Sequence, residues 1–599
     1  MHLDLAKSSH SLVLMSGIAS IILISCLLIY RYVYPKKTIH PVILVFLISL
    51  LPVISIFRPG SYESGDLSFH TMNTISYYHM LFGENILPRW TPEFNVGYGD
   101  PFFLFSYLFP YFIGSVFHFI GFGYLLSIKL LLALSFILSG LTMYLWAKDE
   151  LGEKAGFVSA IFYLFAPYHL VDLHFRVTIA ETLSFAFIPL ILFLVKKVIT
   201  TPKIYYIIAG AVSYGLLILS HQIIALSFFP IAILYGLFVW MMKKQKGYKE
   251  LFKFFVTLCL GLLLTLFYWF PILTEAKYTQ ASLSKNLSIF TPLPQLLYSP
   301  WRFGFLFQGH HGELSYIIGY TQLAVVIMAI YLLFKGELPK KLRLLLLFTL
   351  LFFFILFFLM LPIAQPLWRI VPLLNYFQFS YRLLELVALC TATLAGIVVT
   401  KWNNKVFIII LCFLTIFYTI LNWGNRRNIP EINDAYLINQ LHTRPESAMT
   451  YMEPSSPIWA NLQKSHLRTY PKSHIQILSG SAEIKELSRT SIDHTYIINA
   501  KSNVEIKENT LYFLGWTLLV NKQPHAIFYT NPKAPGVITF SLSKGLYEVE
   551  LKYQDTPDRK YSMIVSIATA IFTMLLLCFS FIKAFQKKKN LPYKKPKKT

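Results

Sequence analysis

Apolar runs of about 20 residues recur along the chain, and they limit its fold more than any other feature. An α-helix needs a run of that length to cross the hydrocarbon core of a bilayer. Composition agrees, since 55% of the 599 residues are hydrophobic, whereas a soluble domain rarely exceeds about half apolar. The sequence therefore predicts a polytopic α-helical membrane protein of the cell membrane.

Basic residues gather in short loops between the apolar runs and at the C-terminus. The loops are KDELGEK (148–154), KK (196–197), KKQK (243–246), KGELPKKLR (335–343) and KWNNK (401–405), and eight lysines stand among the last seventeen residues. Cytoplasmic loops carry such an excess of Lys and Arg, so these segments are predicted to lie inside. No aromatic-basic interleaving accompanies the net charge of +24. We therefore expect membrane lipids, and no nucleic acid, as partners of the basic tail.

Placing these loops inside leads to a topology of about thirteen spans. Residues 1–39 form an N-terminal anchor helix that enters from outside, and the transmembrane domain covers 40–422. Its first outer loop, 58–123, ends in the apolar segment 101–123. If that segment crossed, the basic loop at 148–154 would lie outside. Together with Pro101 and Pro110, this predicts a broken helix that re-enters or lies on the surface.

Residues 423–562 are a different kind of sequence. Short alternating or β-rich runs such as HTYIINA and GLYEVELKY are separated by turn residues such as NPKAPG. This spacing predicts an extracytoplasmic, β-sandwich-like domain. All five cysteines lie in apolar runs outside it, so no disulfide framework is expected. Residues 563–599 are the predicted last transmembrane helix and basic cytoplasmic tail.

The outer loop contains the cluster SYESGDLSFH, residues 61–70, directly after an apolar run. Asp66 stands at a predicted helix start, and His70 follows at i+4 on the same face. The pair is suited to a general base with an orienting histidine, or to a divalent metal, although two ligands alone make a weak metal site. The alternative is that Asp66 only caps the helix. Glu63 lies in a looser part of the loop, which favours Asp66 as the base.

Further ionisable residues lie at the predicted outer ends of other helices. Arg176 and Glu181 occur in HFRVTIAETLSF, His221 in LSHQIIAL, and Arg382 in FQFSYRLLEL. Ionisable groups at membrane depth are costly and often mark a site. The structural alternatives are a snorkelling arginine with a helix-start glutamate, a hydrogen-bonded turn histidine, and an Arg382–Glu385 pair that neutralises itself. The functional interpretation is phosphate binding by the arginine fork.

Several motifs are missing from the sequence. We find no GxxxxGK[ST], no GxGxxG after a strand, no GxSxG and no HExxH. This disfavours an ATP-driven pump, a dinucleotide enzyme, a lipase and a metalloprotease. Two similar halves with interrupted helices, typical of many transporters, are also missing.

An early outer loop with an acidic residue, then many spans, then an outer C-terminal domain: this arrangement resembles the GT-C superfamily of membrane glycosyltransferases. More closely, it is similar to the bacterial YfhO-like and pyruvoyl-tetrahydropterin-synthase-related membrane proteins. The matching pieces are GD (65–66), LPRW (87–90), GYGDPFFLFSYLFPY (97–111), YHLVDLHFRVTIAE (168–181), LSHQ (219–222), FQFSYRLL (377–384), LYFLGWTLLVN (511–521) and GLYEVELKYQDTPDR (545–559). Ser380 and Val177 depart from the family, which often has proline and glycine there. These departures concern backbone geometry and remove no ionisable group.

The resemblance implies sugar transfer from a polyprenyl-phosphate-linked donor to an envelope polymer or lipid acceptor on the outer side. Asp66 would then be the base for the acceptor hydroxyl. Arg382 or Arg176 would stabilise the departing phosphate, with Glu181 and His221 beside the substrate. Trp90 and Tyr98, with the aromatic segment 97–111, would stack on sugar or lipid. The β-rich domain would cover the cavity or recruit the acceptor polymer.

Two other classes of protein stay open at this point. A flippase or transporter of lipid-linked sugars would carry charged residues through the middle of its helices. A non-catalytic protein of envelope assembly would tolerate loss of Asp66. The gathering of ionisable residues at outer helix ends favours the enzyme.

Overall fold

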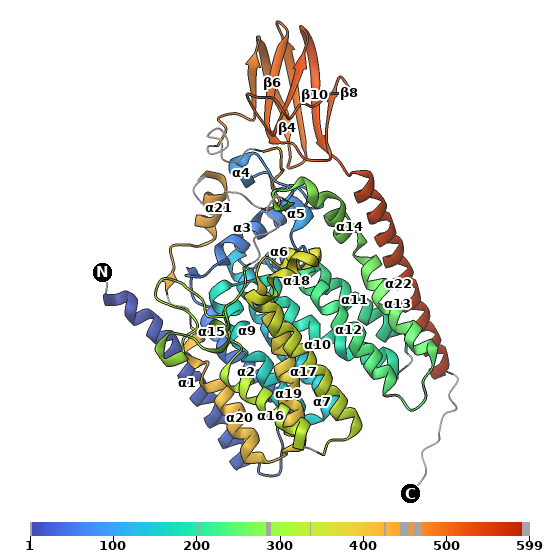
Figure 1. Ribbon diagram of the computed structural model, residues 1–599. Helices are drawn as coiled ribbons and strands as arrows, with labels where there is room; N and C mark the ends of the chain where they lie inside the picture. Colours follow the sequence, from blue (N-terminus) through green and yellow to red (C-terminus); the bar gives the residue numbers. More distant parts are fainter. Residues whose placement is uncertain are drawn as a thin grey trace.

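The computed structural model of the protein describes residues 3–589 except 202, 283–288, 336, 425–426, 444–453 and 461–469. A bundle of helices carries a group of β-strands at one end, and the long last helix runs from these strands along the side of the bundle (Figure 1). The predicted fold class, a helical membrane protein with a C-terminal β-rich region, is confirmed. Residues 590–599 of the basic tail lie outside the described residues.

Seven helices in the described part of the chain are long and apolar enough to cross a membrane. They are α7 (Tyr124–Leu151), α10 (Ile179–Thr200), α12 (Gln222–Met241), α17 (Lys340–Met360), α19 (Leu384–Lys401, with the preceding turn), α20 (Lys405–Phe417, with the following turn) and α22 (Pro557–Lys589). Two bent pairs raise the number to nine. These are α8 (Glu153–Leu164) with α9 (Pro167–Val171) and the turn to Arg176, and α13 (Tyr248–Leu264) with α14 (Leu266–Glu275).

Four further apolar helical segments have only 10–17 residues. They are Gly17–Val33 of α1 (Leu3–Val33), α2 (Pro41–Val53) with the following turn, α11 (Ile204–Ser220) and α16 (Tyr320–Lys335). The count of about thirteen spans therefore stays a prediction. The described helices differ strongly in burial. The apolar window of α19 is 94% buried, whereas that of α22 is 22% buried. Thus α19 is a central helix, and α22 turns most of its apolar surface outward.

Three of the basic loops meet at one end of the bundle. Lys196 and Lys197 at the end of α10 form ion pairs of 3.0 and 2.5 Å with Asp149 near the end of α7. Lys196 and Lys341 also pair with Glu150, at 2.7 and 2.5 Å. The predicted alternation of the spans requires these loops to share a face. Which side of the membrane that face occupies stays a prediction.

The segment 101–123 forms two short helices, α5 (Phe102–Phe105) and α6 (Phe109–Phe119). At 1.5 Å per residue, the 11 residues of α6 reach about 16 Å, about half of a bilayer core. No single helix crosses here, in agreement with the expected break. The helices α3 (Leu67–Tyr78) and α4 (Phe94–Gly97) also lie between the bundle and the strands (Figure 1). We call this part of the molecule, between the bundle and the strands, the outer layer.

The chain after residue 423 first returns to this outer layer. Strand β2 (Asn428–Ile429) pairs with β1 (Ser61–Tyr62), and α21 (Asp434–Thr443) packs beside α3. The carboxylate of Asp434 accepts hydrogen bonds of 2.8 and 2.9 Å from the first N–H groups of α7. Residues 428–443 are therefore packed with the helical part, and the β-strands of the C-terminal region begin at β3.

Two antiparallel sheets form the C-terminal β-region. One has the order β4–β5–β10–β7–β8 and the other β3–β6–β9. The strands are β3 (Ile475–Ser479), β4 (Ala482–Arg489), β5 (Asp493–Ala500), β6 (Val504–Leu511), β7 (Trp516–Val520), β8 (Gln523–His525), β9 (Val537–Leu542) and β10 (Gly545–Tyr553). Alternate residues of β5 and β6, such as Ile498 and Ile506, are fully buried. This alternation is typical of sheets that share one core.

An ion pair fixes the β-region and α22 to the bundle. Arg559, near the start of α22, donates from Nε to Oε1 and Oε2 of Glu275 in α14, at 3.1 and 3.0 Å, and from Nη2 to Oε2 at 2.6 Å. It also donates to the carbonyl of Leu514, at 2.9 Å. Arg559 is 1% exposed and Glu275 is 3% exposed. The pair therefore joins three parts of the fold: α14, the β-region and α22.

Candidate functional site

A hydrogen-bonded junction between two outer segments positions Asp66. The N–H groups of Gly65 and Asp66 donate to the carbonyl oxygens of Phe175 and Arg176, at 2.7 and 2.9 Å. A Cβ at residue 65 would lie 2.9 Å from the Arg176 carbonyl oxygen, so the close approach requires glycine. Asp66 occupies the N-cap position of α3, as predicted, but its side chain makes no capping hydrogen bond. A pure capping role is therefore wrong.

The other side of this junction is a wide helical turn, η3 (Asp172–Arg176). It ends at Val177, whose φ of +59° is left-handed, a conformation unfavourable for a β-branched residue. The turn directs the guanidinium of Arg176 back into the bundle. There Arg176 donates to Asp172 at 2.6 Å and to the hydroxyl of Tyr168 at 2.7 Å.

Glu181, at the start of α10, is the centre of the site. Its carboxylate accepts two hydrogen bonds from Arg176, at 2.9 and 3.0 Å, and one from Nε of Arg382, at 3.2 Å. The hydroxyl of Tyr168 also donates to it, and Nε2 of His221 lies 3.8 Å away. Glu181 is 2% exposed. The structure thus brings together four predicted site residues: Arg176, Glu181, His221 and Arg382.

The alternative in which Arg382 pairs with Glu385 is wrong. Arg382 lies in the 3-10 turn η9 (Ser380–Leu383) before α19, so the i+3 spacing of an α-helix does not apply. Its Nε bonds to Glu181, 201 positions away, and its Nη1 donates to the Phe377 carbonyl at 2.9 Å. Glu385 instead accepts from the Ser184 hydroxyl at 2.5 Å.

The charges around Asp66 affect its pKa in opposite directions. Burial raises the pKa of Asp66 most, and Glu181 raises it further, whereas Arg176 and Arg382 lower it. The net result is a pKa above the usual value of an aspartate. A carboxylate with a raised pKa is a stronger base, and the positive charges of Arg176 and Arg382 limit this rise.

A cavity of about 250 Å³ adjoins these groups. Arg382 and His221 line it together with four aromatic side chains, Phe69, Phe102, Phe105 and Tyr107. The rings of Tyr107 and His221 are stacked, with centroids 6.2 Å apart. Burial raises the pKa of the Tyr107 hydroxyl, and the negative charge of Asp66 raises it further. The central part of the predicted aromatic wall, 97–111, therefore lines a cavity that also contains an arginine and a histidine.

His70 makes a different contact from the predicted one. It is 1% exposed, and its Nδ1 lies 3.0 Å from the hydroxyl of Tyr111, to which Asn73 donates at 3.1 Å. Burial lowers the pKa of His70 to about 3, so the ring is neutral. The backbone N–H of His70 donates to the backbone carbonyl of Asp66 at 2.8 Å, but in the described residues no hydrogen bond joins their side chains. The orienting role of His70 stays a prediction.

The described residues provide no further ligands for the predicted divalent metal at Asp66 and His70. Among the residues that the structure describes, no group of three or more His, Cys, Asp or Glu side chains is placed to hold a metal ion. Asp66 and His70 alone do not make a metal site. We therefore derive no step through a metal.

We correct the prediction for Trp90 and Tyr98, which lie in the interface with the β-region. Trp90 is 1% exposed, and its ring lies 5.3 Å from those of Trp516 and Tyr553. Tyr98 is 3% exposed, and its carbonyl accepts from the N–H of Leu511 at 2.7 Å. Both residues anchor the β-region and neither lines the cavity.

Sequence reasoning missed Tyr168 and Asp100. Tyr168 bonds to both Arg176 and Glu181, and Asp100 accepts three side-chain hydrogen bonds although it is fully buried. Each stands inside a motif already quoted, YHLVDLHFR or GYGDPFF. The signal for Asp100 was an aspartate between glycine and proline in an otherwise aromatic segment.

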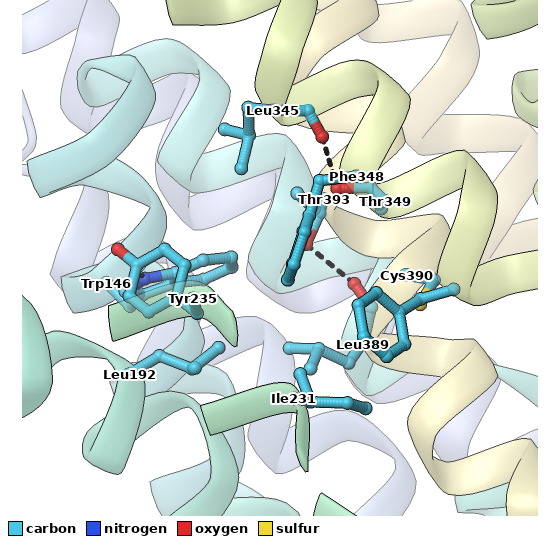
Figure 2. A pocket seen from close by; sticks show the side chains of 11 residues that line it. Trp146, Leu192, Ile231, Tyr235, Leu345, Phe348, Thr349, Leu389, Cys390 and Thr393 are labelled. Atoms are coloured by element: carbon cyan, nitrogen blue, oxygen red, sulfur yellow. Dashed lines mark hydrogen bonds between the residues drawn. The ribbon is translucent and has the colours of Figure 1, made fainter. Parts of the chain in front are cut away.

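A second cavity, among α7, α10, α12, α17 and α19, is no candidate (Figure 2). Its volume of about 20 Å³ is about that needed for one water molecule. Its lining is largely apolar, and the hydroxyls of Thr349 and Thr393 donate to carbonyls of their own helices, at 2.8 and 2.7 Å.

Three solved structures show partial likeness to the chain. The arabinofuranosyltransferase AftD from Mycobacteria aligns with a TM-score of 0.45 and 15% identity, over 65% of this chain and 27% of AftD. The oligosaccharyltransferase AglB from Archaeoglobus fulgidus, in complex with an inhibitory peptide and a dolichol-phosphate, has a TM-score of 0.40 and 13% identity, over 69% and 59%. ArnT from Cupriavidus metallidurans has a TM-score of 0.24 and 12% identity, over 60% and 77%.

Sequence comparison identifies a relative and a family. An uncharacterized protein of Lactococcus lactis subsp. cremoris (strain MG1363) is 22% identical over 253 residues, which are 41% of this chain and 41% of that protein. The family described as 6-pyruvoyl-tetrahydropterin synthase related domain, membrane protein, matches residues 105–425. This match contains Arg176, Glu181, His221 and Arg382, and it extends over more than half of the chain. The chain therefore belongs to the family of 6-pyruvoyl-tetrahydropterin synthase related membrane proteins.

Proposed function

We propose that the protein transfers a sugar from a polyprenyl-phosphate-linked donor to an acceptor of the cell envelope, a polymer or a lipid, on the extracytoplasmic side. The observation that carries the proposal is the pairing of two groups: Asp66, an uncapped carboxylate with a raised pKa that responds to the charge of Arg382, and Arg382 itself, which lines the cavity. A base and a phosphate-binding cation are the two groups that this transfer requires.

In the proposed reaction, the acceptor hydroxyl attacks the anomeric carbon of the donor sugar. Asp66 takes the hydroxyl proton, the new glycosidic bond forms, and the bond from the anomeric carbon to the phosphate oxygen breaks. The polyprenyl phosphate leaves with that electron pair. A phosphate leaving group needs little protonation, so the main requirement is a cation at the departing charge.

Arg382 is the better of the two arginines for this role. It lines the cavity, whereas Arg176 is held by Asp172, Tyr168 and both oxygens of Glu181. If Arg382 turns from Glu181 to a phosphate, Glu181 keeps its two hydrogen bonds from Arg176. No uncompensated buried carboxylate is then left behind, which would otherwise cost several kcal/mol.

The distribution of charges in the helices supports the enzyme over a transporter. In the candidate spans that the structure describes, charged residues lie toward the two ends: Glu181 at the start of α10, Glu385 at the start of α19, and Lys129 in the second turn of α7. A path for a charged headgroup through the membrane needs polar groups at mid-depth. The identity of the lipid donor and the outward orientation of the site are parts of the proposal.

The test is Asp66→Asn in the native host, with Glu63→Gln as the matched control from the same loop. Glu63 is an exposed carboxylate, so its loss should change nothing. At equal protein levels, Asp66→Asn should abolish the added sugar in an analysis of envelope glycan composition. A normal glycan composition in the Asp66→Asn strain would overturn the catalytic proposal and would favour a role in envelope assembly.

A further inference from the structure

A short extramembrane segment, Pro454–Ala460, forms one wall of the cavity. Pro454 and Ser455 line it alongside Arg382, His221 and Ser106. We call residues 454–460 the strap. In the sequence the strap lies between α21 and the first strand of the β-region, so the cavity is built from membrane helices and extramembrane chain together.

A buried carboxylate holds the strap in place. The hydroxyls of Ser455 and Ser456 donate to the two oxygens of Asp100, each at 2.6 Å. Asn95 donates to the same carboxylate at 3.0 Å. Asp100 is 0% exposed, and such charge-assisted hydrogen bonds are stronger and more directional than apolar contacts. These hydrogen bonds fix the strap at Ser455, which lines the cavity.

The other edge of the strap is tied to the segment after α14. The N–H groups of Gln280 and Ala281 donate to the carbonyls of Ser456 and Pro454, both at 2.8 Å. The ring of Trp459 lies between Tyr278, at 5.7 Å, and Tyr529 of the β-region, at 5.1 Å. The strap is thus attached on both edges, and it connects the cavity with the β-region.

We propose that the strap is the acceptor-side wall of the cavity and that Asp100 is the residue that positions it. This inference rests on the proposed function. The donor phosphate belongs on the opposite side, where Arg382 precedes the membrane helix α19. A hydrophilic envelope acceptor reaches the cavity from outside the membrane, past the strap. Its hydroxyl is aligned for attack only if this wall keeps its place.

The first test measures whether Asp100 fixes the strap, without any substrate. Ser106→Cys, introduced after the five native cysteines are replaced, is labelled with a membrane-impermeant maleimide. Asp100→Ala should increase the labelling rate about tenfold, because the wall beside Ser106 opens locally. Asp100→Asn, which keeps hydrogen-bonding atoms in place, should label like the parent.

The matched control is Asp434→Ala, which removes another carboxylate tie of the outer layer, at the start of α7. It should leave the labelling rate of Ser106→Cys unchanged. An unchanged rate in Asp100→Ala, or an equal increase in Asp434→Ala, would overturn the proposal that Asp100 specifically holds the strap.

The second test separates the acceptor side from catalysis in the native host. Asp100→Ala should lose envelope glycosylation and release free sugar, because water replaces the misplaced acceptor, and Asp100→Asn should restore transfer. Asp66→Asn should lose both transfer and release. Normal glycosylation in Asp100→Ala, or loss without released sugar, would contradict the acceptor-side assignment. Normal glycosylation in Asp66→Asn would instead refute the proposed function, while the labelling result would still stand.

Discussion

The backbone N–H of Asp66 donates a 2.9 Å hydrogen bond to the carbonyl oxygen of Arg176. The proposed base therefore sits on the same turn that sends the Arg176 side chain to Glu181. This turn ends in Val177, buried and in a left-handed conformation. Unfavourable backbone conformations persist where the surroundings determine them, and they are frequent at functional sites. The position of Asp66 thus depends on a strained turn more than 100 residues further along the chain.

We expect Arg176→Met to destabilise the protein by about 3–5 kcal/mol, because it leaves Asp172 and Glu181 buried with one cation fewer. Thermal unfolding of the purified protein in detergent measures this. Arg369→Met is the control, since Arg369 is an exposed arginine of another outer segment. Equal melting temperatures for the two variants would show that Arg176 contributes no more than a surface charge.

We expect Arg382→Met to lower the rate of transfer about 100-fold, the usual cost of removing one donor that stabilises charge in a transition state. Its effect on stability should be smaller than that of Arg176→Met, because Glu181 keeps its two bonds from Arg176. Arg382→Lys should recover part of the rate, since it keeps the charge but loses the planar fork. Wild-type glycan levels in Arg382→Met would exclude Arg382 as the phosphate ligand.

Local sequence signals were sufficient for the apolar helices, the β-rich region and the helix start at Asp66. They were insufficient for the centre of the site. Glu181 and Arg382 are 201 residues apart, and no spacing rule reports such a pair. The alternative Arg382–Glu385 pair assumed an α-helix where the chain forms a 3-10 turn. Ion pairs between distant elements depend on helix packing, which single-sequence patterns do not contain.

Aromatic residues were ambiguous for a related reason. Phe102, Phe105 and Tyr107 line the cavity, whereas Trp90 and Tyr98, nearby in sequence, are buried against the β-region. A ring that contacts substrate and a ring that fills an interface have the same composition and hydropathy. The distinction depends on where the β-region docks, and that position is set by contacts such as Trp90 with Trp516.

We expect Glu275→Ala to destabilise the protein by about 3–5 kcal/mol, because the buried guanidinium of Arg559 would lose its carboxylate. The pair holds the β-region and α22 to the bundle, so proteolysis should also cut the outer layer faster. Glu483→Ala is the control, because Glu483 pairs with Lys501 on the surface, where an ion pair contributes less than about 1 kcal/mol. If both variants melt alike, the Glu275–Arg559 pair is not what attaches the β-region.

Asp100 predicts a pH dependence of stability. Burial raises the pKa of Asp100 to about 6, although the hydrogen bonds from Ser455, Ser456 and Asn95 lower it in part. In the unfolded chain an aspartate has a pKa of about 3.9. Between these two values the folded protein binds a proton that the unfolded chain releases. The free energy of unfolding therefore falls as the pH rises from about 4 to 6.

Asp100→Asn should remove this contribution, because an amide does not titrate. At pH 7 the variant should be more stable than the wild type by up to about 3 kcal/mol, since one pKa unit corresponds to about 1.4 kcal/mol. At pH 4, where Asp100 is protonated in the folded protein, the two should melt at similar temperatures. Melting curves of both proteins between pH 4 and 8 measure the difference, and all other titrating groups cancel in it. A pH-independent difference would mean that Asp100 keeps its ordinary pKa in the folded protein. Its burial beside Ser455 and Ser456 would then not disfavour the carboxylate.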